Sequence, residues 1–200
     1  MCRTKWIYYT IAVGVVLLDQ GTKLWVHFNM PLGAAGTIPL LGKWLKLYHV
    51  RNPGMALGIQ LGWKYGKLLL TFTRTLAVCA ISYHIAHIQR KLPRRSIWGW
   101  ALVLGGAIGN TIDNLFYAAV LPQYPGDTDL SWGYGQVIDM IYLDLWHGQI
   151  PRWLPGIGGN FIVLFPIFNL ADVAIIIGIL IILWATTRRA HHEKPIKVHD

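Results

Sequence analysis

Four aspartates in strongly apolar surroundings are the residues best suited to chemistry in this sequence. Asp19, Asp113 and Asp172 fall inside long hydrophobic blocks, and Asp139 lies in the apolar segment VIDMIYL between the last two blocks. A carboxylate at membrane depth is costly and is a functional-site hypothesis by default. These four carboxylates are therefore the first candidates for a functional site.

Two carboxylates a few ångströms apart do not both ionise readily, so one of them keeps a proton. One can then take a proton from a water molecule while the other donates a proton to a substrate carbonyl. Such hydrolysis needs two aspartates, a water molecule and polar groups that orient them. The sequence has no HExxH and no GxSxG motif. We therefore expect an aspartate pair that works without a metal ion or another cofactor.

Four apolar blocks approach or reach the roughly 20 residues that a helix needs to cross a bilayer. The chain is 54% hydrophobic and 14% charged, whereas soluble domains carry about 25% charged residues. We predict one all-α membrane domain over residues 1–200. Its transmembrane helices cover about residues 6–28, 68–88, 97–120 and 168–187.

Basic residues gather before the first block, between the second and third, and after the fourth. By the positive-inside rule, both termini and the short link at about 89–96 face the cytoplasm. The longer links, about 29–67 and 121–167, then face outward. The net charge of +9 thus indicates topology and contact with anionic lipids rather than nucleic-acid binding. Arg74 interrupts the second block, and it either contacts lipid head groups or snorkels.

Helix rise places the aspartates at one depth. Asp19 is 13 residues past Trp6, about 20 Å from the cytoplasmic end. Asp113 is 16 residues past Ile97, about 24 Å from the same side. Asp172 is about 6 Å from the outer end of its block. Asp139 also lies near the outer surface, because its segment begins and ends outside. We therefore predict a site near the outer face of the membrane.

Each aspartate in a block has a polar partner three or four residues away on the same helix face. The pairs are Asp19 with Lys23, Asn110 with Asp113, and Asn169 with Asp172. Asp19 and Lys23 have the spacing of an ion pair. Glycines just before Asn110 allow close helix packing. The pattern predicts a packed cluster of Asp and Asn side chains.

The outward links differ in their patterns. Residues 44–50 alternate and precede the turn Asn52-Pro53-Gly54, which predicts short strands in a small extracytoplasmic β-rich cradle. Residues 121–135 and 146–159 are rich in Pro, Gly and Trp, and we predict loops on the membrane surface there. The fold class is therefore four transmembrane helices with a β-rich cradle and a surface loop or helix.

Five stretches, in order along nearly the whole chain, resemble the motifs of bacterial lipoprotein signal peptidase (signal peptidase II), a family of intramembrane aspartic peptidases. They are Leu18–Lys23 (LDQGTK), Asn52–Gly58 (NPGMALG), Gly105–Asn114 (GGAIGNTIDN), Val137–Asp139 (VID) and Phe165–Asp172 (FPIFNLAD). The resemblance implies that Asp139 and Asp172 are the catalytic pair. It implies support or substrate binding by Asp19, Lys23, Asn52, Gly54, Asn110, Asp113, Asn114 and Asn169.

The resemblance also implies a function. A member of the family removes the signal peptide from prolipoproteins, before a cysteine that carries a diacylglyceryl group. It spans the bacterial inner membrane four times, with both termini in the cytoplasm, and contacts membrane lipids. We expect it to act as a monomer. One departure is Asn114, which stands where the family usually has Arg; Arg51 or Lys23 is then a candidate replacement cation.

Two other functions compete with a peptidase. Intramembrane Asp and Asn residues also mark the pathways of small ion- or proton-coupled carriers. Carriers tend to place their sites near the midplane and to have internal repeats, whereas here the aspartates are off-centre and no repeat is visible. A non-catalytic membrane assembly factor would use the polar cluster only for helix packing.

Overall fold

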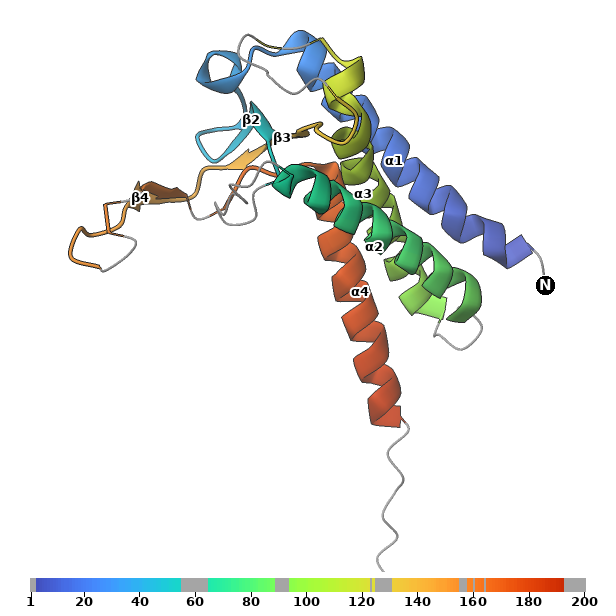
Figure 1. Ribbon diagram of the computed structural model, residues 1–200. Helices are drawn as coiled ribbons and strands as arrows, with labels where there is room; N and C mark the ends of the chain where they lie inside the picture. Colours follow the sequence, from blue (N-terminus) through green and yellow to red (C-terminus); the bar gives the residue numbers. More distant parts are fainter. Residues whose placement is uncertain are drawn as a thin grey trace, which may run out of the picture.

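The protein is a bundle of four helices with a small sheet at one end (Figure 1). The helices are α1 (Arg3–Asn29), α2 (Gly66–Ile88), α3 (Arg94–Val120) and α4 (Leu170–His192). Each coincides with one predicted block. The computed structural model describes residues 3–54, 65–88, 94–122, 124, 131–154, 158–159, 161–163 and 165–192. Residues 55–58 of the second motif, and the basic residues at 90–91 and 194–197, lie outside these ranges.

Two of the helices are long and apolar enough to cross a membrane. They are α2, over Gly66–His87, and α4, over Leu170–Arg188. Helices α1 and α3 are longer, at 27 residues each, but they carry several charged and amide side chains of the predicted site. Two membrane-crossing helices are therefore supported by length and composition, and four remain a prediction.

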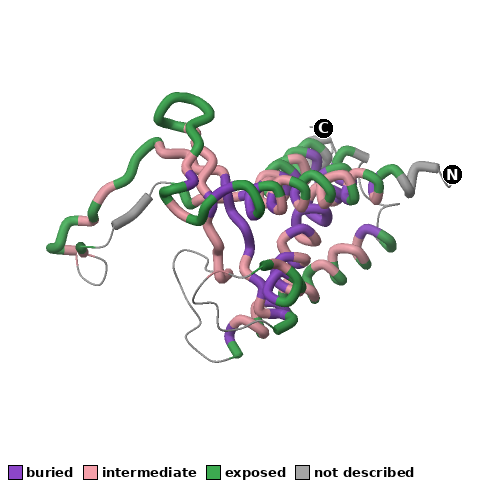
Figure 2. Tube along the Cα trace, turned by 90° about the horizontal axis from the view of Figure 1, so that it is seen from above, coloured by how far each residue is buried: buried purple, intermediate pink, exposed green. Residues whose placement is uncertain are grey.

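Apolar side chains cover the outside of the bundle. Exposed large side chains occur on α1 (Leu17, Leu18), on α2 (Phe72, Leu76) and on α4, where Leu180 is 60% exposed. Figure 2 shows the buried residues where helices and strands meet, and exposed residues along the outer surfaces. An apolar exterior of this extent is typical of a surface that meets lipid.

Three antiparallel strands form the predicted cradle: β1 (Ile38–Leu41), β2 (Leu45–Asn52) and β3 (Val137–Leu143), in the order β1-β2-β3. The strands predicted in the first outward link are confirmed. The third strand is the segment VIDMIYL from the second link. In the register of β2 with β3, Asn52 pairs with Val137 and Val50 pairs with Asp139. Asn52 and Asp139 are thus diagonal neighbours on one face of the sheet.

The loop predicted over residues 146–159 is partly wrong. His147–Gln149 (β4) pairs with Phe161–Val163 (β5) in a two-stranded arm that extends away from the helices (Figure 1). The sequence of β4 is His-Gly-Gln, so it lacks the apolar alternation that predicts a strand. Its pairing partner lies beyond a Pro- and Gly-rich stretch, which is why local pattern did not reveal it.

Glycines on α3 allow the other helices to approach the site closely, as predicted. A Cβ atom at Gly106 would collide with the carbonyl oxygen of Ala171 on α4. A Cβ atom at Gly109 would lie 2.5 Å from Oδ2 of Asp19 on α1. Small residues at these two positions therefore bring α1, α3 and α4 together at one level.

Candidate active site

The first turn of α4 fixes Asp172. Asn169 stands at the N-cap, and its Oδ1 accepts a hydrogen bond from the backbone N–H of Asp172 at 3.0 Å. Oδ2 of Asp172 accepts a hydrogen bond from the backbone N–H of Asn169 at 3.2 Å. This reciprocal arrangement is a capping box with Asp at its third position. The i, i+3 spacing seen in the sequence thus becomes a rigid helix start.

Strand β3 presents Asp139 to the same place. Oδ1 of Asp139 accepts a hydrogen bond from Nδ2 of Asn169 at 2.6 Å, and Oδ2 accepts one from Nδ2 of Asn52 at 3.1 Å. Oδ1 of Asn52 in turn accepts the backbone N–H of Gly54 at 2.9 Å, which orients its amide. Gly54 has a φ of +97°, and a Cβ atom there would collide with Leu70. Glycine therefore makes this turn possible.

Two asparagines join the aspartates. Nδ2 of Asn110 donates to Oδ1 of Asp172 at 2.8 Å. Oδ1 of Asn110 accepts a hydrogen bond from Nδ2 of Asn169 at 3.1 Å, and the same Nδ2 also donates to Asp139. Asp139 and Asp172 are therefore held by one continuous set of amide hydrogen bonds from α3, α4 and the cradle.

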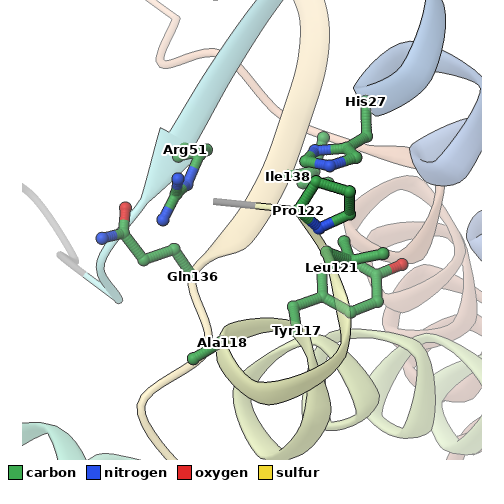
Figure 3. A pocket seen from close by; sticks show the side chains of 8 residues that line it. All are labelled: His27, Arg51, Tyr117, Ala118, Leu121, Pro122, Gln136 and Ile138. Carbon is green, nitrogen blue, oxygen red and sulfur yellow. The ribbon is translucent and has the colours of Figure 1, made fainter. Parts of the chain in front are cut away.

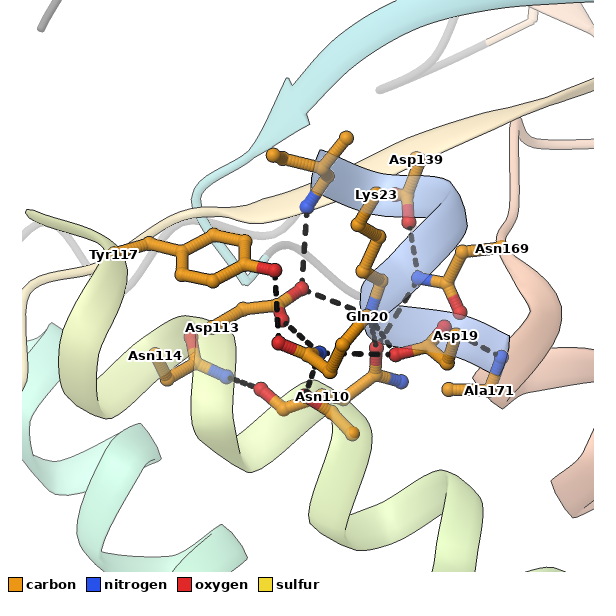
Figure 4. A network of polar contacts seen from close by, with 12 residues as sticks. Asp19, Gln20, Lys23, Asn110, Asp113, Asn114, Tyr117, Asp139, Asn169 and Ala171 are labelled. Carbon is orange, nitrogen blue, oxygen red and sulfur yellow. Dashed lines mark hydrogen bonds and ion pairs between the residues drawn. The ribbon is translucent and has the colours of Figure 1, made fainter. Parts of the chain in front are cut away.

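A buried ion cluster adjoins the asparagines (Figure 4). Nζ of Lys23 lies 2.7 Å from Oδ2 of Asp19 and 2.8 Å from Oδ2 of Asp113, and all three side chains are fully buried. Nζ also donates to Oδ1 of Asn110 at 2.9 Å. The predicted Asp19–Lys23 ion pair is confirmed. Lys23 therefore neutralises part of the negative charge and fixes the amide of Asn110.

Gln20 completes this cluster, although the sequence analysis did not single it out. Its Nε2 donates to Oδ1 of Asp113 at 2.8 Å, and its Oε1 accepts the hydroxyl of Tyr117 at 2.9 Å. Oδ1 of Asp19 accepts the backbone N–H of Ala171 at 2.9 Å, which caps α4 a second time. Gln20 lies within the LDQGTK stretch, so its motif was the available signal.

Asp139 lies on strand β3 of the cradle, and its carboxyl group titrates unusually. Its side chain is buried, with the residue 3% exposed. Burial, together with the nearby carboxylate of Asp172, raises the pKa of Asp139 to about 7, although the amides of Asn52 and Asn169 oppose the shift. Asp139 can thus hold a proton near neutral pH while it faces a second carboxylate, as hydrolysis by an aspartate pair requires.

Comparison with known proteins adds a family to this geometry. The family model described as signal peptidase (SPase) II matches residues 11–188. A lipoprotein signal peptidase of Amoebophilus asiaticus is 45% identical over 202 residues, covering 100% of this chain and 85% of that protein. One of Porphyromonas gingivalis is 35% identical, covering 86% of this chain and 79% of that protein. The chain belongs to the signal peptidase II family.

Solved structures agree with this membership. One, described as a bacterial membrane enzyme, superposes with a TM-score of 0.63 at 26% identity and covers 100% of this chain and 96% of that chain. A second with the same description has a TM-score of 0.60 at 26% identity, over 93% of this chain and 94% of that chain. The helix bundle and cradle are thus the arrangement of a known bacterial membrane enzyme.

Asn114 is the departure from the family motif, and it directly follows Asp113 on α3. It is fully buried, and its Nδ2 donates to the backbone carbonyl of Asn110 at 2.6 Å. Its Oδ1 is buried without a hydrogen-bond partner among the residues that the structure describes. Asn114 therefore supports the backbone of α3 at Asn110 but supplies no charge.

Neither cation suggested by the sequence replaces the family's Arg. Lys23 is fully engaged by the ion cluster. Arg51 points to the opposite face of β2 from Asn52, where its guanidinium lies 5.4 Å from the ring centre of Tyr124. Figure 3 shows Arg51 at a small separate cavity that is also lined by His27 and Gln136.

Arg74 of α2 is the cation that does face the aspartates. Its guanidinium interacts electrostatically with Asp172, then with Asp139 and Asp113. From the sequence, Arg74 was expected to contact lipid head groups or to snorkel. A charged residue inside an apolar block was the signal that marked it, but its direction depends on how α2 packs.

Proposed function

We propose that this protein is a membrane-embedded aspartic endopeptidase that removes the signal peptide from diacylglyceryl-modified prolipoproteins, cleaving before the lipidated cysteine. The observation that carries the proposal is the role of Asn169. Its side-chain amide donates to Asp139, while its Oδ1 and backbone N–H hold Asp172. Two carboxylates fixed by one residue are suited to share a proton. Relatives named lipoprotein signal peptidase supply the substrate class.

The geometry supports a general acid–base mechanism. Asp172 takes a proton from a water molecule as the water oxygen attacks the scissile carbonyl carbon. Asp139, whose raised pKa keeps it protonated near neutral pH, donates its proton to the carbonyl oxygen. The tetrahedral intermediate then collapses: the C–N bond breaks, the proton held by Asp172 passes to the leaving nitrogen, and one hydroxyl of the intermediate returns a proton to Asp139 as the C=O bond re-forms. Asn52, Asn110 and Asn169 hold the carboxylates in place, so little reorganisation is needed.

The proposed setting is the bacterial inner membrane, with four spans and both termini in the cytoplasm. The candidate spans α2 and α4 and the apolar exterior of the bundle support this arrangement. The site lies at the end of the bundle that adjoins the cradle (Figure 1), so in this topology it is near the outer face. A substrate anchored in the same membrane can then reach the site sideways, and the protein is proposed to act as a monomer.

The proposal is tested by lipid dependence. The purified protein in detergent is incubated with a diacylglyceryl-modified prolipoprotein and with the same prolipoprotein lacking the lipid, and the products are measured by mass spectrometry. We expect one cut, before the modified cysteine, in the lipidated substrate alone. No cut in either, with a substrate that a known signal peptidase II cleaves, would overturn the proposal and favour a carrier or an assembly factor.

A further inference from the structure

Helix α2 carries an arginine in its apolar interior. Lys67 and Arg74 are the Lys and Arg residues of this helix, and Lys67 stands at its start. Arg74 lies eight residues past Gly66, about 12 Å along the helix. Ionisable side chains at such depth are rare in membrane helices and normally face a protein interior or a polar cavity. We therefore expect a polar or charged group beside the guanidinium of Arg74.

One nitrogen of this guanidinium has no hydrogen-bond partner among the residues that the structure describes. That nitrogen, Nη1 of Arg74, is buried. The guanidinium interacts electrostatically with carboxylates, most strongly with Asp172 and then with Asp139. Those two carboxylates already accept hydrogen bonds from asparagine amides. An unsatisfied buried donor destabilises a fold, so its presence beside the aspartates indicates a ligand oxygen.

The turn after β2 places Arg74 next to the aspartate pair. A Cβ atom at Gly54 would lie 4.0 Å from Nη2 of Arg74. Gly54 donates to Asn52, and Asn52 donates to Asp139. The guanidinium thus lies between α2 and the turn that orients Asn52. On the side of Asp139 and Asp172 that faces α2, Nη1 of Arg74 is a donor without a hydrogen-bond partner among the described residues. On the other sides, the groups of α1, α3 and α4 that contact the aspartate pair or its asparagines are already hydrogen-bonded.

A further donor is useful to a substrate because the neighbouring amides already donate to the aspartates. Nδ2 of Asn169 donates to two acceptors, and Nδ2 of Asn52 and of Asn110 each donate to a catalytic carboxylate. A guanidinium presents several N–H groups in a fixed plane, which suits carbonyl oxygens. We infer that Arg74 binds the lipid-modified substrate by donating to a carbonyl oxygen beside the scissile bond. This inference rests on the proposed function.

The inference also accounts for Asn114. The family motif usually has Arg at this position of α3, whereas here the side chain of Asn114 is fully buried and donates to the backbone carbonyl of Asn110. In this chain a guanidinium near the aspartate pair comes from the facing helix α2 instead.

The test measures binding separately from cleavage. All proteins carry Asp172→Asn, so that the peptide is bound but not cleaved, and are placed in lipid nanodiscs. The affinity for a diacylglyceryl-modified peptide is then compared between the protein that keeps Arg74 and the variants Arg74→Gln and Arg74→Lys. We expect Arg74→Gln to weaken binding by about 10- to 100-fold, as for loss of a hydrogen bond to a charged group. Arg74→Lys, which retains charge but loses the planar fork, should fall between. The matched control Arg188→Gln removes a guanidinium that lies over Trp184 at the other end of the bundle and should bind normally.

Thermal stability separates binding from a structural role. Because Nη1 of Arg74 has no hydrogen-bond partner in the described ranges, Arg74→Gln should leave the Tm unchanged or raise it, whereas loss of a structural residue would lower it. The inference would be overturned if Arg74→Gln bound the peptide within twofold of the protein that keeps Arg74. It would also be overturned if Arg74→Gln bound more weakly and showed a clear fall in Tm. Cleavage of the lipidated substrate by the wild-type protein is measured in parallel, so failure of the proposed function is seen independently of Arg74.

Discussion

Asp139 and Asp144 belong to one strand and the turn after it, yet their surroundings give them opposite chemistry. Asp139 is buried, accepts hydrogen bonds from neutral amides and faces Asp172, so its pKa rises to about 7. Asp144 lies at the start of the β4 arm, where hydrogen bonds from Lys46 at 2.6 Å and His147 at 2.7 Å lower its pKa to about 2. The two carboxylates are therefore in different protonation states at pH 5.

The difference between Asp139 and Asp144 shows that hydrogen bonds can orient a carboxylate while its pKa stays high. A cationic donor fixes a carboxylate and also stabilises its charge, as Lys46 does for Asp144. Neutral amides fix Asp139 with less effect on its charge, so burial and the second carboxylate dominate. The charged donor Lys23 is set one layer away, where it holds Asn110 and the structural aspartates.

The largest effect is expected from removing either proton-transfer group. Asp139→Asn and Asp172→Asn keep the shape and much of the hydrogen bonding but cannot exchange a proton with water or substrate. Each should reduce single-turnover cleavage by at least about 10³-fold, since general acid–base groups contribute up to about 10⁴-fold. Normal elution and Tm confirm that each variant is folded. Near-normal cleavage by either one would remove that residue from the mechanism.

Breaking the ion cluster should act mainly on stability. Lys23→Met leaves Asp19 and Asp113 buried without their cation, and breaking a buried pair in this way costs about 3–5 kcal/mol. Chemical denaturation in detergent measures the free energy of unfolding. The triple variant that adds Asp19→Asn and Asp113→Asn should recover part of the loss. A triple variant less stable than Lys23→Met would show that the charges are not the cause.

Asn169→Ala should reduce cleavage more than stability. The helix cap contributes about 0.5–2 kcal/mol, whereas Asp139 and Asp172 both lose their common partner. We expect cleavage to fall by about 100-fold, because each misplaced group costs transition-state stabilisation. The measurement compares the change in kcat/KM with the change in Tm. A variant that loses stability but retains its kcat/KM would contradict the bridging role.

The smallest effect is expected on the arm. Asp144→Asn removes hydrogen bonds and ion pairs near solvent, which contribute little, and Asp144 has no contact with the site. Cleavage should stay within about twofold of wild type, as for surface substitutions away from special features. A large loss would mean that the arm takes part in substrate binding and that Asp144 is more than a surface carboxylate.

Local sequence patterns predicted much of the site because its residues come in short helical spacings. The Asp19–Lys23 ion pair and the pairing of Asn169 with Asp172 follow from i, i+4 and i, i+3 positions on one helix. The predicted depths of Asp19, Asp113 and Asp172 came from helix rise. The four helical blocks were recognisable from their apolar composition. The close packing at Gly106 and Gly109 was predicted because glycine has no side chain.

Contacts between distant elements were not predictable in the same way. The pairing of β2 with β3, which sets Asn52 beside Asp139, depends on a register between segments far apart in sequence. The direction of Arg74 depends on how α2 packs, and the β4–β5 arm has no apolar alternation. Each of these features is decided by tertiary contacts rather than by periodicity.

The most direct test of the account is the dependence of cleavage on pH. Asp139 must be protonated to act as the acid, and its pKa of about 7 means that it is protonated below that pH and ionised above it. The kcat of the wild-type protein on a lipidated substrate should therefore fall as pH rises through about 7, approaching tenfold per pH unit, and Asp144→Asn should give the same curve. A kcat that stays constant or rises from pH 6 to pH 9 would contradict the shared-proton mechanism.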